Sequence, residues 1–255
     1  GRIDQVADDV SGFKKGDRVF GLTRFGGYAQ FAVTQAQAVS HLPEEAPIGT
    51  GCALATQCVT AYHAAILSQT LLPGEKVLIH AAAGGLGTAL VQIALWKGCT
   101  VIGVAGGSEK VEYLKNLGVH HVVDHHRINW TDYVHQYLNG RVDVIFDNIG
   151  GSSIKKGKSV LAHGGRIVTL GAAALSGKKG KLNLIRLGLG FGFFSPIAYL
   201  SKSQSLIGVN MLKIADYRPD MLAESFKGVT TLHSKGILNP HIGAIFNGTE
   251  LDKAH

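Results

Sequence analysis

Residues 80–87 read His-Ala-Ala-Ala-Gly-Gly-Leu-Gly, a glycine-rich turn whose surroundings could give it chemistry. An apolar run precedes it at 76–79, and the following segment, 88–94, is typical of a helix. In dinucleotide-binding units with this order, the turn glycine lets the backbone approach a pyrophosphate. The last glycine lets the helix pack close to the strand, and the helix N-terminus faces the anion. The pattern predicts a pyrophosphate site, with a generic glycine-rich turn as the alternative.

A second apolar run at 100–104 completes a strand, helix, strand unit around this turn. Ala82 stands where the usual G-x-G-x-x-G pattern has its first glycine, and Gly84 and Gly87 hold the second and third positions. An alanine fits a tight turn if its φ is negative. We therefore expect the turn to form with Ala82 in the first position.

The end of that second strand indicates which nicotinamide cofactor would bind. An NAD-binding protein places an acidic side chain about twenty residues beyond the glycines, where it takes the ribose hydroxyls. Here residues 104–110 read Val-Ala-Gly-Gly-Ser-Glu-Lys, so small residues leave room for a phosphate, and Ser108 and Lys110 supply a hydroxyl and a positive charge. The pattern predicts NADPH. Two alternatives stay open: Lys110 is a solvated lysine of the next helix, or Glu109, although late, takes the acidic role.

The composition indicates a globular α/β protein, because the 255 residues are 45% hydrophobic and the 34 glycines show no repeat. Three cysteines form no C-x-x-C pair, which favours a reducing, cytoplasmic setting. The formal net charge of +7 comes from scattered clusters without interleaved aromatic residues, so we expect no nucleic-acid partner. We interpret these clusters as solvated faces, with peripheral contact to an acidic membrane surface as the alternative.

The two ends of the chain carry no processing signal. It begins at Gly1 without an initiator methionine, signal peptide or transit-like segment and stops at His255, so we expect both ends to be cut. The longest apolar stretch, 187–200, is shorter than a bilayer span and contains Pro196. We interpret this stretch as a loop and helix that cover a cleft.

Three segments with different patterns predict the domain organisation. Residues 1–46 alternate apolar and polar in short runs, such as 17–20 and 28–33, and predict a small β-rich piece. Residues 47–234 begin with helical periodicity, alternate strand and helix patterns, and end in a helix; this predicts a doubly wound parallel sheet. Residues 235–255 predict a return to the β-rich piece and a helix just begun. The strands expected in the sheet are 76–80, 100–104, 120–123, 142–146, 165–170 and 205–209.

Two of these strands deliver small and polar residues to the carboxyl edge of the sheet, where the ligand lies in doubly wound folds. Asp147 and Asn148 follow the strand at 142–146, and Gly171 follows the strand at 165–170. We expect a loop that lines the nicotinamide pocket, with simple turn chemistry as the alternative.

Several further motifs run in register over nearly all of the chain. They are Gly-Asp-Arg-Val at 16–19, Gly-Gly-Tyr-Ala at 26–29, Thr-Ala-Tyr at 60–62, the turn at 82–87, Lys110, Val-Asp-Val-Ile-Phe-Asp at 142–147, Gly-Gly at 150–151 and Gly-Arg-Ile-Val at 165–168. With these motifs the chain resembles the medium-chain dehydrogenase/reductase superfamily, and within it the zinc-free quinone oxidoreductases. Residues 147–171 and a long insert at 175–204 are most similar to the vesicle amine transport protein branch. The resemblance implies a Rossmann sheet plus part of a GroES-like catalytic domain.

The resemblance also implies that no metal is bound. Zinc alcohol dehydrogenases of this superfamily place a cysteine ligand just upstream of the Thr-Ala-Tyr motif, where this chain has Thr56 and an offset Cys58. A short turn at 23–27 replaces the structural zinc lobe. Without a Lewis acid, the natural substrates are quinones and α,β-unsaturated carbonyls, which take hydride from NADPH directly. The expected activity is therefore a zinc-independent, NADPH-dependent reduction of such compounds.

Tyr62 is the catalytic candidate, as a phenol able to orient a carbonyl, with a half-buried helix tyrosine as the alternative. His125 stands where similar enzymes have a tyrosine that holds the phosphate, and a histidine could do the same while charged. We interpret His120, His121, His125 and His126 as structural or solvent-facing rather than metal-binding, because alternate side chains of a strand face opposite ways. The resemblance places Thr60 at the nicotinamide, the turn residues Gly84, Gly85, Leu86 and Gly87 at the pyrophosphate, and Ser108, Lys110 and His125 at the 2′-phosphate. Asn148 and Gly171 are expected at the cofactor edge because they follow the ends of two strands.

Two other functions stay open: an enoyl-thioester reductase module of a larger synthase, and a non-catalytic NADPH-binding protein whose basic loops and 187–200 segment meet lipids or a partner. The apolar last strand, 205–209, suits a homodimer. The sequence does not name the substrate. Because the small domain would leave open sheet edges, we expect the 255 residues expressed alone to be inactive or poorly folded.

Overall fold

The computed structural model describes residues 1–171, 191 and 194–254. Contacts group the chain into two compact units, Gly1–His63 with Met211–His255, and Ala64–Asn210. Each unit is described by itself. The division expected from sequence, into a partial GroES-like domain at 1–46 and 235–255 and a Rossmann domain at 47–234, stays a prediction.

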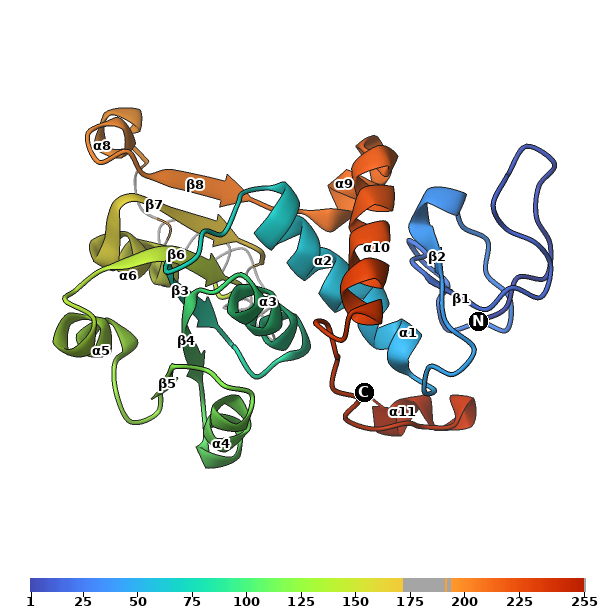
Figure 1. The fold of residues 1–255 in the computed structure, drawn as a ribbon, viewed down its shortest axis with the longest axis horizontal. Coiled ribbons are helices and arrows are strands. Elements are labelled where there is room, and N and C mark those ends of the chain that lie inside the picture. The colour runs from blue at the N-terminus through green and yellow to red at the C-terminus, as the bar shows by residue number, and fades with distance from the viewer. Residues whose placement is uncertain (172–190, 192–193, 255) are drawn as a thin grey trace. The chain divides into compact units, whose positions relative to one another are not determined.

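A six-stranded parallel sheet forms the centre of the unit Ala64–Asn210 (Figure 1). Its strand order is β5-β4-β3-β6-β7-β8, so the winding reverses between β3 and β6. This confirms the predicted doubly wound Rossmann sheet, and all six expected strands are present. They are β3 (Lys76–His80), β4 (Thr100–Ala105), β5 (His121–Asp124), β6 (Val142–Asp147), β7 (Leu161–Thr169) and β8 (Ser205–Gly208).

Helices join successive strands of this sheet. The segment 187–200 was expected to be a loop and helix over a cleft; its residues 187–190 and 192–193 lie outside the described residues, as does much of the insert at 175–204. Of the segment 187–200, the structure describes helix α8. The described helices are α3 (Gly85–Trp96), α4 (Ser108–Asn116), α5 (Trp130–Tyr137), α6 (Ser152–Val160) and α8 (Pro196–Leu200).

The central strands β3 and β6 are apolar on both faces, because helices cover a doubly wound sheet on both sides. Leu78 and Ile145 are fully buried, and so are their neighbours along each strand. Trp130 and Val134 of α5 and Ile154 of α6 pack with them in one core cluster. This packing fixes the carboxyl ends of β3 and β6, from which the site residues project.

A charged cluster ties β7 to the loop before β3. Arg166 of β7 makes a bidentate ion pair with Glu75, with nitrogen to oxygen distances of 2.7 and 2.8 Å, and its Nε donates to Gln69 Oε1. The side chains of Arg166 and Glu75 are only 14% and 15% exposed. A planar guanidinium meets a carboxylate best in this two-point geometry.

The other unit contains a small antiparallel sheet of β1 (Val19–Gly21) and β2 (Val39–His41), with a bridge between Arg2 and Arg18. The expectation of strand structure holds at 17–20 only in part and is wrong at 28–33, where no strand forms. Tyr28, Phe31 and Val33 are 74%, 75% and 98% exposed. Alternating apolar residues form a strand only where another strand takes up their backbone hydrogen bonds.

Helices account for most of the regular secondary structure in the rest of this unit. None of the described helices of the chain is long and apolar enough to cross a membrane. Residues 237–247 belong to the same unit as β1 and β2 and form no strand. The predicted final helix is confirmed. The helical elements are η1 (Ala36–Ala38), α1 (Thr50–Ala53), η2 (Leu54–Cys58), α2 (Val59–Tyr62), η3 (His63–Leu67, which runs into the other unit), α9 (Met211–Tyr217), α10 (Pro219–Ser234), η5 (Gly248–Glu250) and α11 (Leu251–Ala254).

Candidate functional site

The glycine turn connects β3 to α3 with a geometry that demands glycine at one position. A Cβ on Gly87 would overlap the carbonyl oxygen of Ala81 and lie 2.7 Å from the Cα of Ala82. Helix and strand therefore approach as closely as expected for the third glycine of the motif. Ala82 is buried and avoids the left-handed region, as expected, whereas Ala81 adopts a positive φ of 48°.

The first turn of α3 presents backbone donors at this point. Gly84 is the N-cap, and its amide donates to the carbonyl of Ala81 at 2.9 Å. The amides of Gly85, Leu86 and Gly87 have no carbonyl within the helix to bond, because a helix leaves its first amides free. Gly84 and Gly85 are exposed, so an anion can reach these amides. The turn thus brings together the four residues predicted to hold the pyrophosphate.

The loop after β4 carries the residues predicted at the 2′-phosphate. Gly107, with a φ of 93°, is the N-cap of α4, and Ser108 and Lys110 lie exposed in the first turn of that helix. Ala105 of β4 pairs with Asp124 of β5, so the loops after both strands begin side by side. His125 is the first residue after β5, and its amide donates to Ala105 O at 3.0 Å. All three predicted residues therefore follow two neighbouring strand ends.

Asp124 ties these two loops together and was missed in the sequence. Its Oδ1 accepts hydrogen bonds from the amides of His126, at 3.0 Å, and Gly107, at 3.3 Å. The amide of His126 does most to lower the pKa of this carboxyl, with further contributions from Gly107, His126 and Arg127. The signal available in the sequence was an acidic residue at the end of a predicted strand.

Asn148 and Gly171 meet at the next two strand ends. A Cβ on Gly171 would lie 3.4 Å from the carbonyl oxygen of Asn148, and the amide of Leu170 donates to Asp147 O at 2.8 Å. Asp147 is fully buried, and its Oδ1 accepts from the amides of Ile149 and Gly150 at 2.8 and 2.7 Å. Turn chemistry thus accounts for Asp147, while Asn148 and Gly171 remain at the predicted cofactor edge.

His80, the last residue of β3, is the second residue that the sequence reasoning missed. Its ring is buried edge-on to Trp130, and its Nε2 lies 3.3 Å from Ser153 Oγ and 3.9 Å from Asp147 Oδ2. Burial lowers the pKa of His80 to about 4, so the ring is neutral at physiological pH. Its Nδ1 has no hydrogen-bond partner among the described residues. A histidine that ends an apolar strand beside a glycine turn was the available signal.

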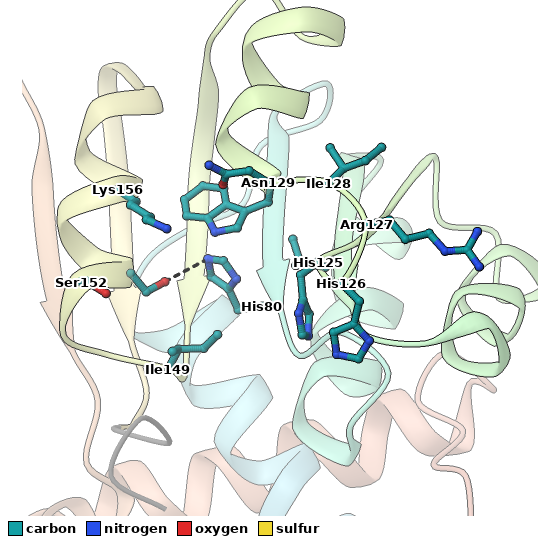
Figure 2. A pocket seen from close by; sticks show the side chains of 12 residues that line it. His80, His125, His126, Arg127, Ile128, Asn129, Ile149, Ser152 and Lys156 are labelled. Carbon is teal, nitrogen blue, oxygen red and sulfur yellow. Dashed lines mark hydrogen bonds between the residues drawn. The ribbon is translucent and has the colours of Figure 1, made fainter.

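A pocket of about 520 Å³ opens beside the ends of β3, β4 and β5. Figure 2 shows His125 and His126 on one side of the His80 ring, and its dashed line marks the 3.3 Å hydrogen bond between His80 Nε2 and Ser153 Oγ. The basic character of the lining suits an anionic ligand. The lining consists of His80, Val104, His125, His126, Arg127, Ile128, Asn129, Trp130, Ile149, Ser152, Ser153 and Lys156.

Thr60 and Tyr62 lie in the other unit, on α2. Thr60 Oγ1 donates to the carbonyl of Thr56 at 2.7 Å. The Tyr62 ring packs against Gly228 of α10, where a Cβ would overlap the ring. Burial, and then the charge of Glu224, raise the pKa of the Tyr62 phenol. This packing accounts for a half-buried helix tyrosine, and the roles proposed for Thr60 and Tyr62 at the nicotinamide stay predictions.

The candidate metal ligands are placed as follows. In the described part of the chain, no group of three or more His, Cys, Asp or Glu side chains could hold a metal ion. Burial raises the pKa of the Cys58 thiol to about 12, so it is protonated at neutral pH. His120 accepts the amide of Val101 at 3.1 Å, and His121 Nδ1 lies 3.1 Å from the Tyr133 hydroxyl.

Comparisons with known proteins agree with this geometry. A family model described as zinc-binding dehydrogenase matches residues 85–226. The quinone oxidoreductase of Homo sapiens is 32% identical over 257 residues, which cover 100% of this chain and 72% of that protein. The synaptic vesicle membrane protein VAT-1 homolog of Homo sapiens is 30% identical over 249 residues, 96% of this chain and 63% of that protein. The crystal structure of CurK enoyl reductase matches with a TM-score of 0.82 and 25% identity, over 100% of this chain and 72% of that one.

A doubly wound sheet with this glycine turn at its carboxyl edge defines a dinucleotide-binding α/β protein. The chain belongs to the quinone oxidoreductase family of the medium-chain dehydrogenase/reductase superfamily, as its motifs predicted. It is therefore an oxidoreductase that uses a nicotinamide cofactor and acts on a small molecule.

Proposed function

We propose that the protein transfers hydride from NADPH to a quinone or another α,β-unsaturated carbonyl without the help of zinc. The observation that carries the proposal is the cofactor edge itself. Gly87 leaves no room for a Cβ, Gly84 and Gly85 leave amides open to an anion, and Ser108 and Lys110 stand exposed beyond β4. These features suit the pyrophosphate and the 2′-phosphate of NADPH.

The proposed preference for NADPH over NADH rests on the absence of an acidic residue after β4 that could bind the ribose hydroxyls of NADH. Residues 104–108 carry no acidic side chain, and the nearby carboxylate of Asp124 accepts backbone amides through Oδ1. That carboxylate is thus used to hold the loops, whereas an NAD site would use an acid for the ribose hydroxyls. Lys110 is exposed in the first turn of α4 and supplies charge.

Bound NADPH supplies the hydride, and the chain supplies position and hydrogen bonds. In the proposed mechanism the α3 amides would bind the diphosphate of the cofactor, and the loop after β4 would bind its ribose 2′-phosphate. Asn148 and Gly171 line the nicotinamide side of the edge, and Tyr62 orients the carbonyl of the substrate. A conjugated substrate spreads the added charge to its oxygen, so orientation and one hydrogen-bond donor are sufficient.

Assays of NADPH oxidation by the full-length protein against a panel of quinones and enones test this proposal. We expect turnover that persists after treatment with a zinc chelator, with no stoichiometric zinc by elemental analysis. Absence of turnover with every quinone and enone, or activity that follows a bound zinc, would overturn it.

An enoyl-thioester reductase is a second candidate, favoured by the 25% identity to CurK enoyl reductase. An acyl-thioester such as crotonyl thioester added to the same panel separates the two, since a thioester reductase would turn it over faster than any quinone.

A non-catalytic NADPH-binding protein that associates with membranes is a third candidate, favoured by the 30% identity to the synaptic vesicle membrane protein VAT-1 homolog. Co-sedimentation with liposomes, without turnover of any member of the panel, would support this candidate over the other two.

A homodimer through β8 is part of the proposal, because β8 is an edge strand whose Leu206 is 37% exposed. Analytical ultracentrifugation tests it.

A further inference from the structure

Gly228 lies inside α10, although the interior of a helix disfavours glycine. Glycine loses more backbone freedom on folding than alanine does, so a glycine in the middle of a helix lowers the stability of that helix. Gly228 belongs to the buried face of α10, which consists of Leu222, Ser225, Phe226, Gly228, Val229 and Leu232. The glycine therefore needs a reason in the packing of this face.

The Tyr62 ring of α2 supplies that reason, and both residues belong to the unit of Gly1–His63 with Met211–His255. A Cβ on Gly228 would overlap the Cζ and Cε2 atoms of the ring. Cζ is the ring carbon that carries the hydroxyl, so the outer end of the side chain, and not its base, rests on the glycine. A side chain at position 228 would thus displace the phenol itself.

A buried hydrogen bond holds α2 on α10 close to this contact. His63, which follows Tyr62, has its Nδ1 3.4 Å from Ser225 Oγ. Ser225 Oγ donates to the carbonyl of Met221 at 2.8 Å, so the His63 ring is the donor to Ser225. His63 and Ser225 are 3% and 0% exposed. The backbone at the end of α2 is therefore fixed, and the Tyr62 ring lies over Gly228, three residues further along α10.

The surroundings of the phenol keep it protonated. Burial, and then the charge of Glu224, raise the pKa of Tyr62. Glu224 lies about one turn before Gly228 on α10. A phenol with a raised pKa keeps its proton at neutral pH and is a hydrogen-bond donor. In the proposed function this donor orients the carbonyl of the substrate.

We propose that Gly228 is a positioning residue for the reduction: by leaving room for the ring, it holds the Tyr62 hydroxyl where this group donates to the carbonyl of a quinone or enone. The inference rests on the proposed function and adds to it a residue of α10. Because Gly228 has no side chain, it acts on the reaction through Tyr62 alone.

The Tyr62 ring, and not the helix, should give way when a methyl group is added to Gly228. The overlapping atoms are at the far end of a side chain that can rotate, whereas the hydrogen bond between His63 and Ser225 holds the backbone of α2. Alanine is also more favourable than glycine inside a helix. Gly228→Ala should therefore fold and displace the hydroxyl.

Steady-state kinetics of the full-length protein with NADPH and a quinone that it reduces test the inference. We expect Gly228→Ala to lower kcat about tenfold or more, to the level of Tyr62→Phe, with the KM for NADPH unchanged. Tyr62→Leu provides a background without a phenol, and its side chain ends at Cδ, short of the ring atoms that a Cβ on Gly228 overlaps. Adding Gly228→Ala to Tyr62→Leu should leave kcat unchanged, and this comparison holds even if Gly228→Ala by itself does not fold.

Ser225→Ala is the matched control on α10. It removes the hydrogen bond to His63 and should lower the Tm, but it leaves the space over Gly228 to the Tyr62 ring. We expect Ser225→Ala to keep its kcat, which separates a loss of stability from a displacement of the phenol.

The possible outcomes separate the inference from the proposed function. An unchanged kcat in Gly228→Ala, or a fall that Ser225→Ala matches, overturns the inference and leaves the proposed function standing. A fall in kcat when Gly228→Ala is added to Tyr62→Leu also overturns it, because Gly228 then acts by a route other than the phenol. An unchanged kcat in Tyr62→Phe removes Tyr62 from the proposed mechanism and overturns the inference with it. Absence of turnover with every quinone and enone overturns the proposed function as a whole.

Discussion

Replacing Gly87 by alanine tests the contact on which the pyrophosphate site depends. The added Cβ would overlap Ala81 O and lie 2.7 and 2.8 Å from the Cα and carbonyl carbon of Ala82. These are backbone atoms, which cannot rotate aside as the end of a flexible side chain can, so α3 must move away from β3. Overpacking of this kind costs about 1–3 kcal/mol, which corresponds to a fall in Tm of roughly 2–12 °C for a chain of this size. Displacement of the α3 amides should also weaken NADPH binding.

Two other glycines serve as controls for this variant. Gly84 has a φ of −80°, and a Cβ there would lie 3.3 Å from Ala81 O, so Gly84→Ala should leave Tm nearly unchanged but weaken NADPH binding by intruding on the ligand. A Cβ on Gly243 would meet no atom within 4 Å, so Gly243→Ala should affect neither property. Thermal unfolding and NADPH titration of the three variants measure both effects. A Gly87→Ala protein with the Tm and affinity of the Gly243→Ala protein would refute the reasoning.

Three further changes test other parts of the structure. Burial raises the pKa of Glu75, but the hydrogen bonds from Arg166 and the amide of Leu72, with the charge of Arg166, outweigh burial, so the net pKa is lowered. The pair therefore stabilises the fold fully above about pH 4.3 and progressively less as pH falls below that value. Urea unfolding should show that Glu75→Gln costs about 1–3 kcal/mol at pH 7 and much less at pH 3. Burial lowers the pKa of His80 to about 4, so as pH falls the unfolded chain takes up a proton on this residue before the folded chain does. The free energy of unfolding should therefore decrease as pH falls from about 6.5 to about 4. His80→Gln should remove this pH dependence, and an unchanged pH dependence would show that another group causes it. Tyr62→Phe should keep the Tm, because the ring still packs on Gly228. It should lower the rate of substrate reduction about tenfold or more and leave the affinity for NADPH unchanged. An unchanged rate would show that Tyr62 is a structural residue.

Much of the nucleotide-binding unit could be predicted from local sequence patterns. Strands such as β3 and β6 are mainly apolar and are followed by turns that contain glycine. Their alternation with helix patterns along the chain predicts a doubly wound sheet. Gly87 was predictable for the same reason, since close packing of a helix on a strand excludes a side chain there.

The parts that could not be predicted depend on contacts between segments distant in sequence. Residues 28–33 alternate like a strand, but a strand also needs a partner, and alternation does not report whether one is present. The turn role of Asp124 depends on amides from two loops, and the burial of His80 depends on Trp130 and Ser153. The packing of the Tyr62 ring on Gly228 likewise joins residues that lie far apart in the chain.

The affinity of the full-length protein for NADPH relative to NADH, before and after Lys110→Ala, tests the central claim most directly. The account predicts that NADPH binds more tightly at pH 7 and that Lys110→Ala weakens NADPH about tenfold while NADH binding stays the same. Glu109→Gln is the neighbouring control and should not weaken either cofactor. Equal or tighter binding of NADH, unaffected by Lys110→Ala, would contradict the account.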